Sequence, residues 1–281
     1  MNRLPIGIAL GSGASRGWAH IGVLRALEEH GLHPDVVCGA SAGSLVAAAY
    51  ASGQLDVLEK WVLDLSRMDI VRLLDTGFRG GFMTGSRVMT AVGSLLKDME
   101  IETLPKRFGA VATDLHTGRE VWLRAGPMLT AVRASSGLPG LFSPMQHQGR
   151  WLIDGGVVNP VPVSMCHALG AEVVIAVNLN ADLVTRRSVK KPPKASRKKT
   201  RKKKEEKQLD EESVFGRFAG ALSALFRGDG DGDAQPDEPG IFDVVGASIN
   251  IMQERITRSR MAGEPPELTI SPKVGDFQLM D

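Results

Sequence analysis

Short runs of β-branched and other apolar residues alternate with amphipathic segments of helical period from residue 6 to about residue 180. Strands buried on both faces of a parallel sheet have such continuous apolar runs, and the helices that cover the sheet keep one apolar face. The pattern therefore predicts an α/β fold with a largely parallel central sheet. The predicted strands are Ile6–Gly11, Val36–Gly39, Phe108–Asp114, Glu120–Leu123, Leu152–Asp154 and Val173–Asn178.

The segments between and after these strands have the apolar spacing of helices. Residues 55–66 and 84–99 are typical of lid or cap helices, and further helices are predicted over 18–31 and 160–170. The stretch "DLHTGREVWL" predicts a hairpin with Thr117 and Gly118 in its turn. Towards the end of the chain, the pattern predicts a long helix over 241–261 and one more strand in "PELTISP".

The composition changes between residues 181 and 240. This part holds a basic run from Arg197 to Lys204, a short apolar island and the acidic, glycine-rich stretch "GDGDGDAQPDEPG". Ordered loops of this length are uncommon inside a compact domain, and the composition is typical of disorder. We therefore expect residues 1–180 and 241–281 to form a single domain, with 181–240 as a largely disordered charged insertion.

The composition of the whole chain is that of an ordinary globular protein. Of its 281 residues, 43% are hydrophobic, and the formal net charge is only +2, which gives no general drive toward nucleic acid. Cys38 and Cys166 each lie in an apolar run, which favours buried reduced thiols over a disulfide or a metal site. No apolar run approaches the roughly 18 residues that span a bilayer, and the N-terminus lacks a signal sequence, so we expect a cytoplasmic protein.

The stretch "VVCGASAGSL" combines the end of a strand with the motif G-x-S-x-G, in which Gly39 and Gly43 flank Ser41. A serine hydroxyl needs exposure, a base and a stabilised oxyanion before it can act as a nucleophile. The flanking glycines allow a tight strand-to-helix turn that exposes the serine at a helix N-terminus. Taken alone, the motif is only weakly specific and favours a plain turn of small residues over catalysis.

A glycine-rich turn follows the first strand in "IALGSGASRGWAH". The backbone amides of Gly13 and Ala14, at the start of a helix, are placed to hold an anion. A dinucleotide site is the alternative, but the spacing of Gly11, Gly13 and Gly17 is not G-x-G-x-x-G. The second strand also offers no acidic residue for a ribose.

In "WLIDGGVVNP", an apolar strand ends at Asp154, before two glycines. An aspartate there either forms a turn with its own backbone or accepts the proton of a nearby serine. A third reading is a Ser-Asp-His triad, because His167 follows Asp154 in the chain. We expect His167, in the middle of a helix, and His20, near the glycine-rich turn, to be structural.

The glycine-rich turn, G-x-S-x-G and D-G-G occur in the order that patatin-like phospholipases have, and the chain resembles in particular the bacterial branch related to neuropathy target esterase. The resemblance implies a three-layer α/β/α sandwich and hydrolysis of lipid acyl esters, of phospholipase A or lysophospholipase type, without metal or cofactor. It implies Ser41 as nucleophile and Asp154 as base of a Ser-Asp dyad. It assigns the oxyanion hole to Ser12, Gly13 and Ala14, the nucleophile elbow to Gly39 and Gly43, and the support of these loops to Arg16, Gly17, Gly155 and Gly156.

The chain departs from the family pattern at Ser12 and Ala14, where glycines are usual. An alanine amide serves an oxyanion hole equally well if its φ is negative. The departure leaves open a catalytically weak or inactive protein that binds acyl ligands and acts as a regulator. The resemblance also brings the loop of Leu138, Leu141 and Phe142 near the nucleophile, although a plain buried connector has the same composition.

The insertion suggests a partner. The basic run precedes an apolar stretch at 213–227. If this stretch is helical, its apolar face consists of Phe215, Phe218, Leu222, Leu225 and Phe226. Such a segment is suited to peripheral contact with an anionic membrane, here through 185–227, at the inner face of the membrane. A solvated linker and an apolar island docked on the protein itself are the alternatives. No nucleic acid is expected, and the sequence does not predict an oligomeric state.

Overall fold

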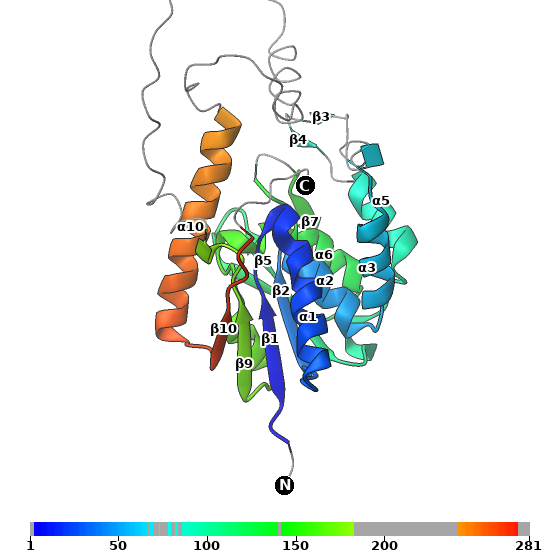
Figure 1. Cartoon of the computed structure of the whole chain (residues 1–281). Helices are drawn as coiled ribbons and strands as arrows, with labels where there is room; N and C mark the ends of the chain where they lie inside the picture. Colours follow the sequence, from blue (N-terminus) through cyan, green and yellow to red (C-terminus); the bar gives the residue numbers. More distant parts are fainter. Residues whose placement is uncertain are drawn as a thin grey trace, which may run out of the picture.

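A computed structural model of the chain describes residues 3–66, 68–69, 73, 78–79, 82–83, 86–139, 142–182 and 241–274. Within these residues, eight strands form one sheet at the centre of the molecule (Figure 1). Its order is β10-β9-β1-β2-β5-β8-β7, and β6 pairs with β5 outside this path. The strands are β1 Ile6–Leu10, β2 Val36–Ala40, β5 Arg107–Asp114, β6 Glu120–Leu123, β7 Met145–His147, β8 Arg150–Asp154, β9 Val173–Val177 and β10 Leu268–Ile270.

The sheet is mixed but mostly parallel. Strands β10, β9, β1, β2 and β5 run parallel to one another. β6 and β8 pair antiparallel with β5, and β7 pairs antiparallel with β8. Because parallel strands share one carboxyl edge, the loops that follow β1 and β2 meet at the same end of the sheet.

Helices cover both faces of the sheet (Figure 1). Side chains alternate along the strands, so Ile8 packs into the core on one face and its neighbour Ala9 into the core on the other. The first face carries α1 Ala19–Glu29, α2 Ala42–Ala51, α3 Leu55–Asp64, α5 Ser86–Leu95 and α6 Met128–Ser135. The second face carries α7 Val163–Ala168 and α10 Ile241–Gly263. The expected three-layer α/β/α sandwich is therefore confirmed.

The observed elements follow the sequence expectations with a few differences. The strand in "PELTISP" is β10, and the expected hairpin joins β5 to β6, with Gly118 at a φ of +67° in its turn. The helix expected over 160–170 is shorter, because Pro160 and Pro162 cannot donate the backbone N–H bonds of a helix interior. The periodicity missed the three-residue strand β7 and the two-residue strands β3 Phe78–Arg79 and β4 Phe82–Met83.

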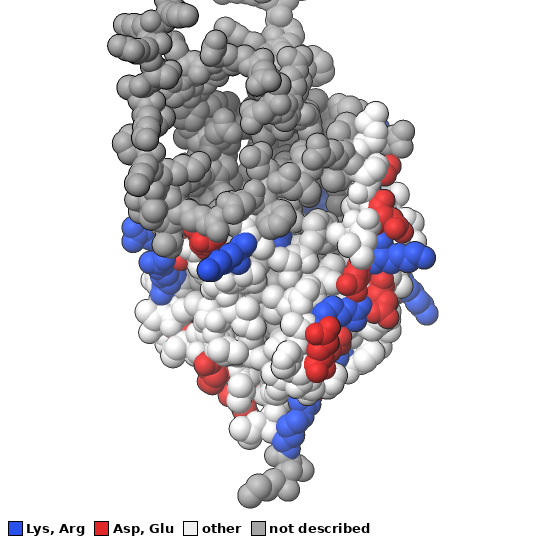
Figure 2. Space-filling view, viewed as in Figure 1, with Lys and Arg blue, Asp and Glu red and all other residues white. Residues whose placement is uncertain are grey.

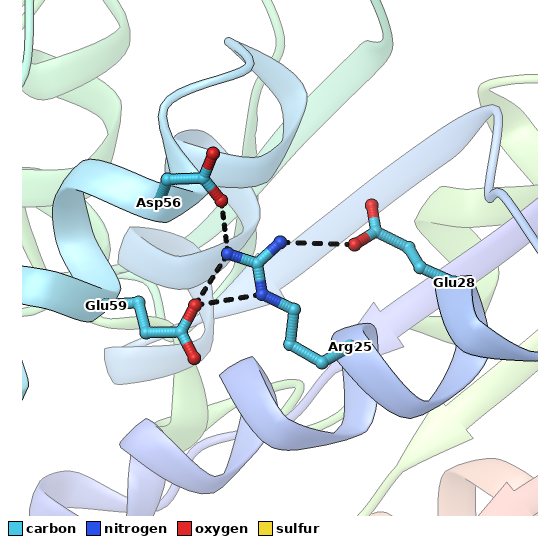
Figure 3. A network of polar contacts seen from close by, with 4 residues as sticks. All are labelled: Arg25, Glu28, Asp56 and Glu59. Atoms are coloured by element: carbon cyan, nitrogen blue, oxygen red, sulfur yellow. Dashed lines mark hydrogen bonds and ion pairs between the residues drawn. The ribbon is translucent and has the colours of Figure 1, made fainter.

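The helices expected as lids, α3 and α5, belong to the layer on the first face. Leu55 and Leu58 of α3 and Val92 of α5 are buried in its core. Arg25 of α1 reaches across to Asp56 and Glu59 of α3 and also binds Glu28 (Figure 3). These carboxylates raise the pKa of Arg25. The cluster is partly exposed and joins two helices at the surface, where such pairs contribute little stability.

Acidic and basic side chains are intermixed on the face drawn in Figure 2, with a wide uncharged area between them. Among the described residues, no helix has both the length and the hydropathy that crossing a bilayer requires. Most of the predicted insertion, residues 183–240, lies outside the described part of the chain. Its predicted disorder and its membrane contact through 185–227 therefore stay predictions.

Candidate active site

Ser41 lies between the end of β2 and the start of α2, at the carboxyl edge of the sheet. Its φ of 56° and ψ of −129° are unusual for a residue with a side chain. Strand and helix approach each other so closely here that a Cβ atom on Gly39 would collide with the carbonyl of Gly43. A Cβ atom on Gly43 would collide with the carbonyl of Leu10 in β1. The two glycines of G-x-S-x-G thus permit the tight turn that the motif predicted.

The register of β5 brings Asp154 to this turn. Ala40, the last residue of β2, pairs with Val111, and Asp154, the last residue of β8, pairs with the next residue, Ala112. The Ser41 hydroxyl donates a hydrogen bond of 2.6 Å to the Asp154 carboxylate. Ser41 is 8% exposed and Asp154 is 0% exposed. A serine and a carboxylate separated by 113 positions thus form a buried pair.

The surroundings of Asp154 favour its neutral form more than water does. Burial raises the pKa of Asp154 to about 6, although the hydrogen bonds from the Ser41 hydroxyl and the Gly156 amide lower it. The Gly156 N–H donates to one carboxylate oxygen at 2.7 Å, and Ser41 donates to the other. Asp154 therefore both caps the turn that follows it and accepts from the serine. A carboxylate with a pKa near 6 is a better proton acceptor than one with an ordinary pKa and is still mostly ionised at pH 7.

The glycine-rich loop runs from β1 into the 3-10 helix η1 Ala14–Trp18, beside Ser41. The Ser12 N–H donates to the carbonyl of Pro160 at 2.8 Å, so this amide is already engaged in the fold. Gly13 has an extended φ of −168°, whereas Ala14 has a φ of +49°. An alanine serves an oxyanion hole as well as a glycine only if its φ is negative, and this condition is not met. Ala14 occupies a backbone conformation that favours glycine.

Arg16 and Gly17 hold this loop against its neighbours. The Arg16 guanidinium donates to the side-chain oxygens of Asn180 at 3.2 Å and Asn250 at 3.3 Å, and burial lowers its pKa. A Cβ atom on Gly17 would collide with the Cβ atom of Ala42, the first residue of α2. The absence of a side chain at Gly17 thus lets η1 pack directly against the start of the helix that follows Ser41.

Gly155 and Gly156 are required for close packing behind Asp154. A Cβ atom on Gly155 would collide with the carbonyl of Val111 in β5. One on Gly156 would collide with the Ser12 hydroxyl and with the side-chain nitrogen of Gln253. The D-G-G motif thus brings the Asp154 loop into contact with both β5 and the glycine-rich loop.

A cavity of about 290 Å³ opens at Ser41. The glycine-rich loop and Leu138 form part of its wall, as the resemblance implied for Leu138; Leu141 lies outside the described residues. The sequence did not predict that α10 also forms part of the wall, through Gly246, Ile249, Asn250 and Gln253. Their spacing of three, four and seven residues puts them on one helix face, and the uncharged polar side chains on that face were the available signal.

Neither candidate histidine lines this cavity. His20 is fully buried, its ring Nε2 bonds the Gly11 carbonyl at 2.7 Å, and burial lowers its pKa to about 4. His167 is exposed near the end of α7 and bonds the carbonyl of Ala171, just before β9 begins. It therefore lies at the amino edge of the parallel strands, opposite the edge that carries Ser41. The geometry favours the serine and aspartate pair over a triad with His167.

Cys38 and Cys166 are free thiols that are buried side by side in the core of the second face. Burial, with a contribution from Cys166, raises the pKa of the Cys38 thiol, so it remains protonated and unreactive at neutral pH. Across the described residues, no group of three or more histidine, cysteine, aspartate and glutamate side chains is placed to hold a metal ion.

Comparison with known proteins gives a match to one family and several similar proteins. The family model described as patatin-like phospholipase matches residues 8–167. An uncharacterized NTE family protein of Mycobacterium tuberculosis is 31% identical over 94% of this chain and 82% of its own length. Lysophospholipase nte1 of Aspergillus fumigatus is 29% identical over 63% of this chain, but this covers only 12% of that protein. The match to the solved structure of VipD from Legionella pneumophila covers 67% of this chain and 52% of the VipD chain, with a TM-score of 0.48 and 15% sequence identity.

The fold and the matched family together define the class of this protein, a carboxylic ester hydrolase built on an α/β/α sandwich. The chain belongs to the patatin-like phospholipase family, and its relatives include proteins of the NTE family. The resemblance in the three sequence motifs is therefore confirmed at the level of the family.

Proposed function

We propose that this chain hydrolyses acyl esters of lipids, as a phospholipase A or lysophospholipase, through a Ser41-Asp154 dyad and an acyl-serine intermediate. The observation that carries the proposal is the buried hydrogen bond of 2.6 Å from the Ser41 hydroxyl to the Asp154 carboxylate. The names of relatives such as the Aspergillus lysophospholipase support the choice of lipid substrates. The apolar side chains of Leu138 and Ile249 in the cavity wall suit an acyl chain.

Acylation begins with proton transfer. As the Ser41 oxygen forms a bond to the acyl carbonyl carbon, its proton passes to Asp154, which is held by Gly156 at its other carboxylate oxygen. The tetrahedral intermediate then collapses, the bond between the carbonyl carbon and the alcohol oxygen breaks, and the departing alcohol takes the proton from Asp154. The products of this step are the free alcohol and an ester between the acyl group and Ser41.

Deacylation repeats these steps with water. Asp154 accepts a proton from a water molecule whose oxygen attacks the acyl-serine carbonyl, and the proton then returns to the Ser41 oxygen as the fatty acid leaves. The dyad ends in its starting state, and the scheme uses no metal or cofactor. The N–H groups of Gly13 and Ala14 are our candidates for the donors that stabilise both tetrahedral oxyanions, because the Ser12 amide is engaged with Pro160.

The sequence of the insertion supports a second part of the proposal. We propose that residues 185–227 bring the enzyme to an anionic membrane surface, at the cytoplasmic face, without forming part of the active site. The basic run supplies attraction to anionic lipids, and the aromatic residues supply shallow insertion. The oligomeric state is not part of this proposal.

Labelling with a fluorophosphonate probe tests the dyad, because only an activated serine reacts with it. Wild type should be labelled and should hydrolyse members of a panel of soluble esters, phospholipids and lysophospholipids. Ser41→Ala should show neither reaction, and Asp154→Asn should lose turnover while both variants keep the wild-type circular dichroism spectrum. Absence of labelling and turnover in wild type would instead favour the alternative of an acyl-ligand-binding regulator, and full turnover in either variant would contradict the dyad.

A further inference from the structure

Ser135, the last residue of α6, contacts the backbone of the nucleophile. Its side chain is fully buried, and its hydroxyl oxygen accepts a hydrogen bond of 3.0 Å from the Ser41 N–H. The two residues are 94 positions apart, and α6 packs beside α2 on the first face of the sheet (Figure 1). Ser135 does not line the cavity at Ser41, so it is not placed to touch a substrate.

This hydrogen bond acts on a residue in an unusual backbone conformation. With a φ of 56° and a ψ of −129°, Ser41 keeps its geometry only if surrounding contacts hold it. The Ser41 carbonyl is held from its own helix, by the N–H of Ser44 at 2.9 Å and the hydroxyl of Ser44 at 2.6 Å. The Ser41 N–H is held from another element, by Ser135. The bond to Ser135 therefore fixes the orientation of the peptide that precedes the nucleophile.

The same short segment also holds the second member of the dyad. Two residues after Ser135, the carbonyl of Gly137 accepts the Asp154 N–H at 3.0 Å. A Cβ atom on Gly137 would lie 3.3 Å from the Ile153 Cα atom, so the segment packs directly on β8. Residues 135–137 thus bind the backbone of Ser41 at one end and the backbone of Asp154 at the other.

We propose that Ser135 is a positioning residue for the nucleophile, and this inference rests on the proposed role of Ser41. Its hydroxyl keeps the Ser41 peptide in the orientation that places the Ser41 oxygen on the carboxylate of Asp154. Segment 135–137 thereby sets the separation of the dyad across two strands that do not pair with each other. Small misplacements of reacting groups reduce rates strongly, so loss of this acceptor lowers the rate of attack and leaves substrate binding in place.

The test compares Ser135→Ala with Ser136→Ala, a matched control in the next position. The Ser136 hydroxyl donates to the carbonyl of Val132 in its own helix and does not contact the dyad. With a soluble short-chain ester, Ser135→Ala should lower kcat by about 10- to 100-fold and change KM by less than about twofold. Fluorophosphonate labelling should slow by a similar factor but reach the wild-type end point. Ser136→Ala should match wild type in kcat and labelling rate.

Ser135→Cys keeps the volume nearly unchanged but supplies a weaker acceptor, so its kcat should fall between those of wild type and Ser135→Ala. It also serves as the test variant if Ser135→Ala does not fold. A kcat and labelling rate within about twofold of wild type in the folded Ser135 variants would overturn the inference. So would a change confined to KM, or a lower labelling end point at an unchanged rate. If Ser41→Ala retains activity, the proposed function itself fails, whereas an inactive Ser41→Ala with a fully active Ser135→Ala contradicts only the positioning role.

Discussion

Asp154 has an unusual environment for an acidic residue. Its carboxylate is fully buried, and the two groups that donate hydrogen bonds to it, the Ser41 hydroxyl and the Gly156 backbone N–H, are both neutral. Its raised pKa of about 6 links activity to pH. Protonated Asp154 cannot accept the Ser41 proton, so kcat/KM for a soluble ester should rise about tenfold per pH unit below pH 6 and level off above it. An initial-rate profile from pH 4.5 to 8 measures this. A profile that is flat across pH 6 would contradict Asp154 as the base.

The same pKa predicts how stability depends on pH. Because the folded pKa lies above the ordinary aspartate pKa of 3.8, the folded state binds more protons than the unfolded state between about pH 4 and pH 6. The contribution of Asp154 to stability is therefore full below pH 4 and is lost as the pH rises through 6. Two pKa units correspond to about 3 kcal/mol. The free energy of unfolding of Asp154→Asn, taken relative to that of wild type, should therefore increase by up to about 3 kcal/mol from pH 4 to pH 7.

Urea unfolding of the two proteins at matched pH values measures this difference, in which the titration of all shared groups cancels. If the stability of Asp154→Asn relative to wild type does not increase from pH 4 to pH 7, the raised pKa of Asp154 is contradicted. Asp154→Asn should also be inactive at every pH if Asp154 is the base. Its stability relative to wild type should be higher at pH 7 than at pH 4, because only wild type buries a charged carboxylate at the higher pH.

Ala14 is strained in a way that glycine would relieve. A φ of +49° is costly for alanine by about 1 kcal/mol, so Ala14→Gly should raise the free energy of unfolding by up to about that amount. Gln148, with a φ of +47° between β7 and β8, offers a matched control because it lies outside the cavity. Both glycine variants should unfold at higher urea concentration, and both should keep full activity. A lower midpoint for Ala14→Gly alone would indicate that the methyl group of Ala14 is stabilising.

At the scale of elements, the close approach of β2, α2 and β1 makes the elbow intolerant of side chains. In Gly43→Ala the new methyl group would meet the backbone carbonyls of Leu10 and Gly11, which cannot move aside as the end of a flexible side chain can. We expect a loss of at least about 2 kcal/mol in stability, together with loss of activity. Urea unfolding and ester hydrolysis measure the two effects.

Gly22, in the middle of α1, is the control for this substitution. A Cβ atom there has no neighbour within 4 Å, so Gly22→Ala should stabilise the helix by about 0.5–1 kcal/mol and leave activity unchanged. A lower free energy of unfolding for Gly43→Ala together with a higher one for Gly22→Ala would support close packing at the turn around Ser41. A neutral Gly43→Ala variant would mean that β1 and α2 do not approach each other as closely as the geometry requires.

At the scale of the whole molecule, deletion tests whether the predicted insertion acts separately from the proposed catalytic domain. Removing residues 185–240 should reduce binding to anionic vesicles, because the basic run and the apolar island are lost together. Hydrolysis of a soluble short-chain ester should be unchanged. Binding of wild type should weaken with added salt, since the attraction is electrostatic. Co-sedimentation with vesicles of phosphatidylserine and phosphatidylcholine, at two salt concentrations, measures these effects.

Equal vesicle binding by wild type and the deletion variant would remove the recruitment proposal. Loss of soluble-ester activity in a folded deletion variant would instead mean that the segment serves the active site. The second outcome has a structural route, because α10 begins at Ile241 and supplies one wall of the cavity. Thermal unfolding of the deletion variant distinguishes loss of the α10 packing from a direct role of the deleted residues.

The sequence alone was sufficient for features that depend on neighbouring residues. Apolar runs and helical spacing predicted most of the strands and helices, because burial on one or two faces imposes a local period. The glycines around Ser41 and after Asp154 predicted tight turns, since close backbone approach excludes side chains. The family, too, followed from the order of three short motifs.

Only the tertiary structure decided how these parts meet. The pairing of Ser41 with Asp154 depends on the register of both β2 and β8 on β5, and register is set by long-range packing. The same holds for the contact of Ser135 with Ser41 and for the wall that α10 forms. The positive φ of Ala14 and the engaged amide of Ser12 are likewise invisible in the sequence, because a backbone angle and a hydrogen-bond partner follow from the neighbours that folding brings, here Pro160 and η1.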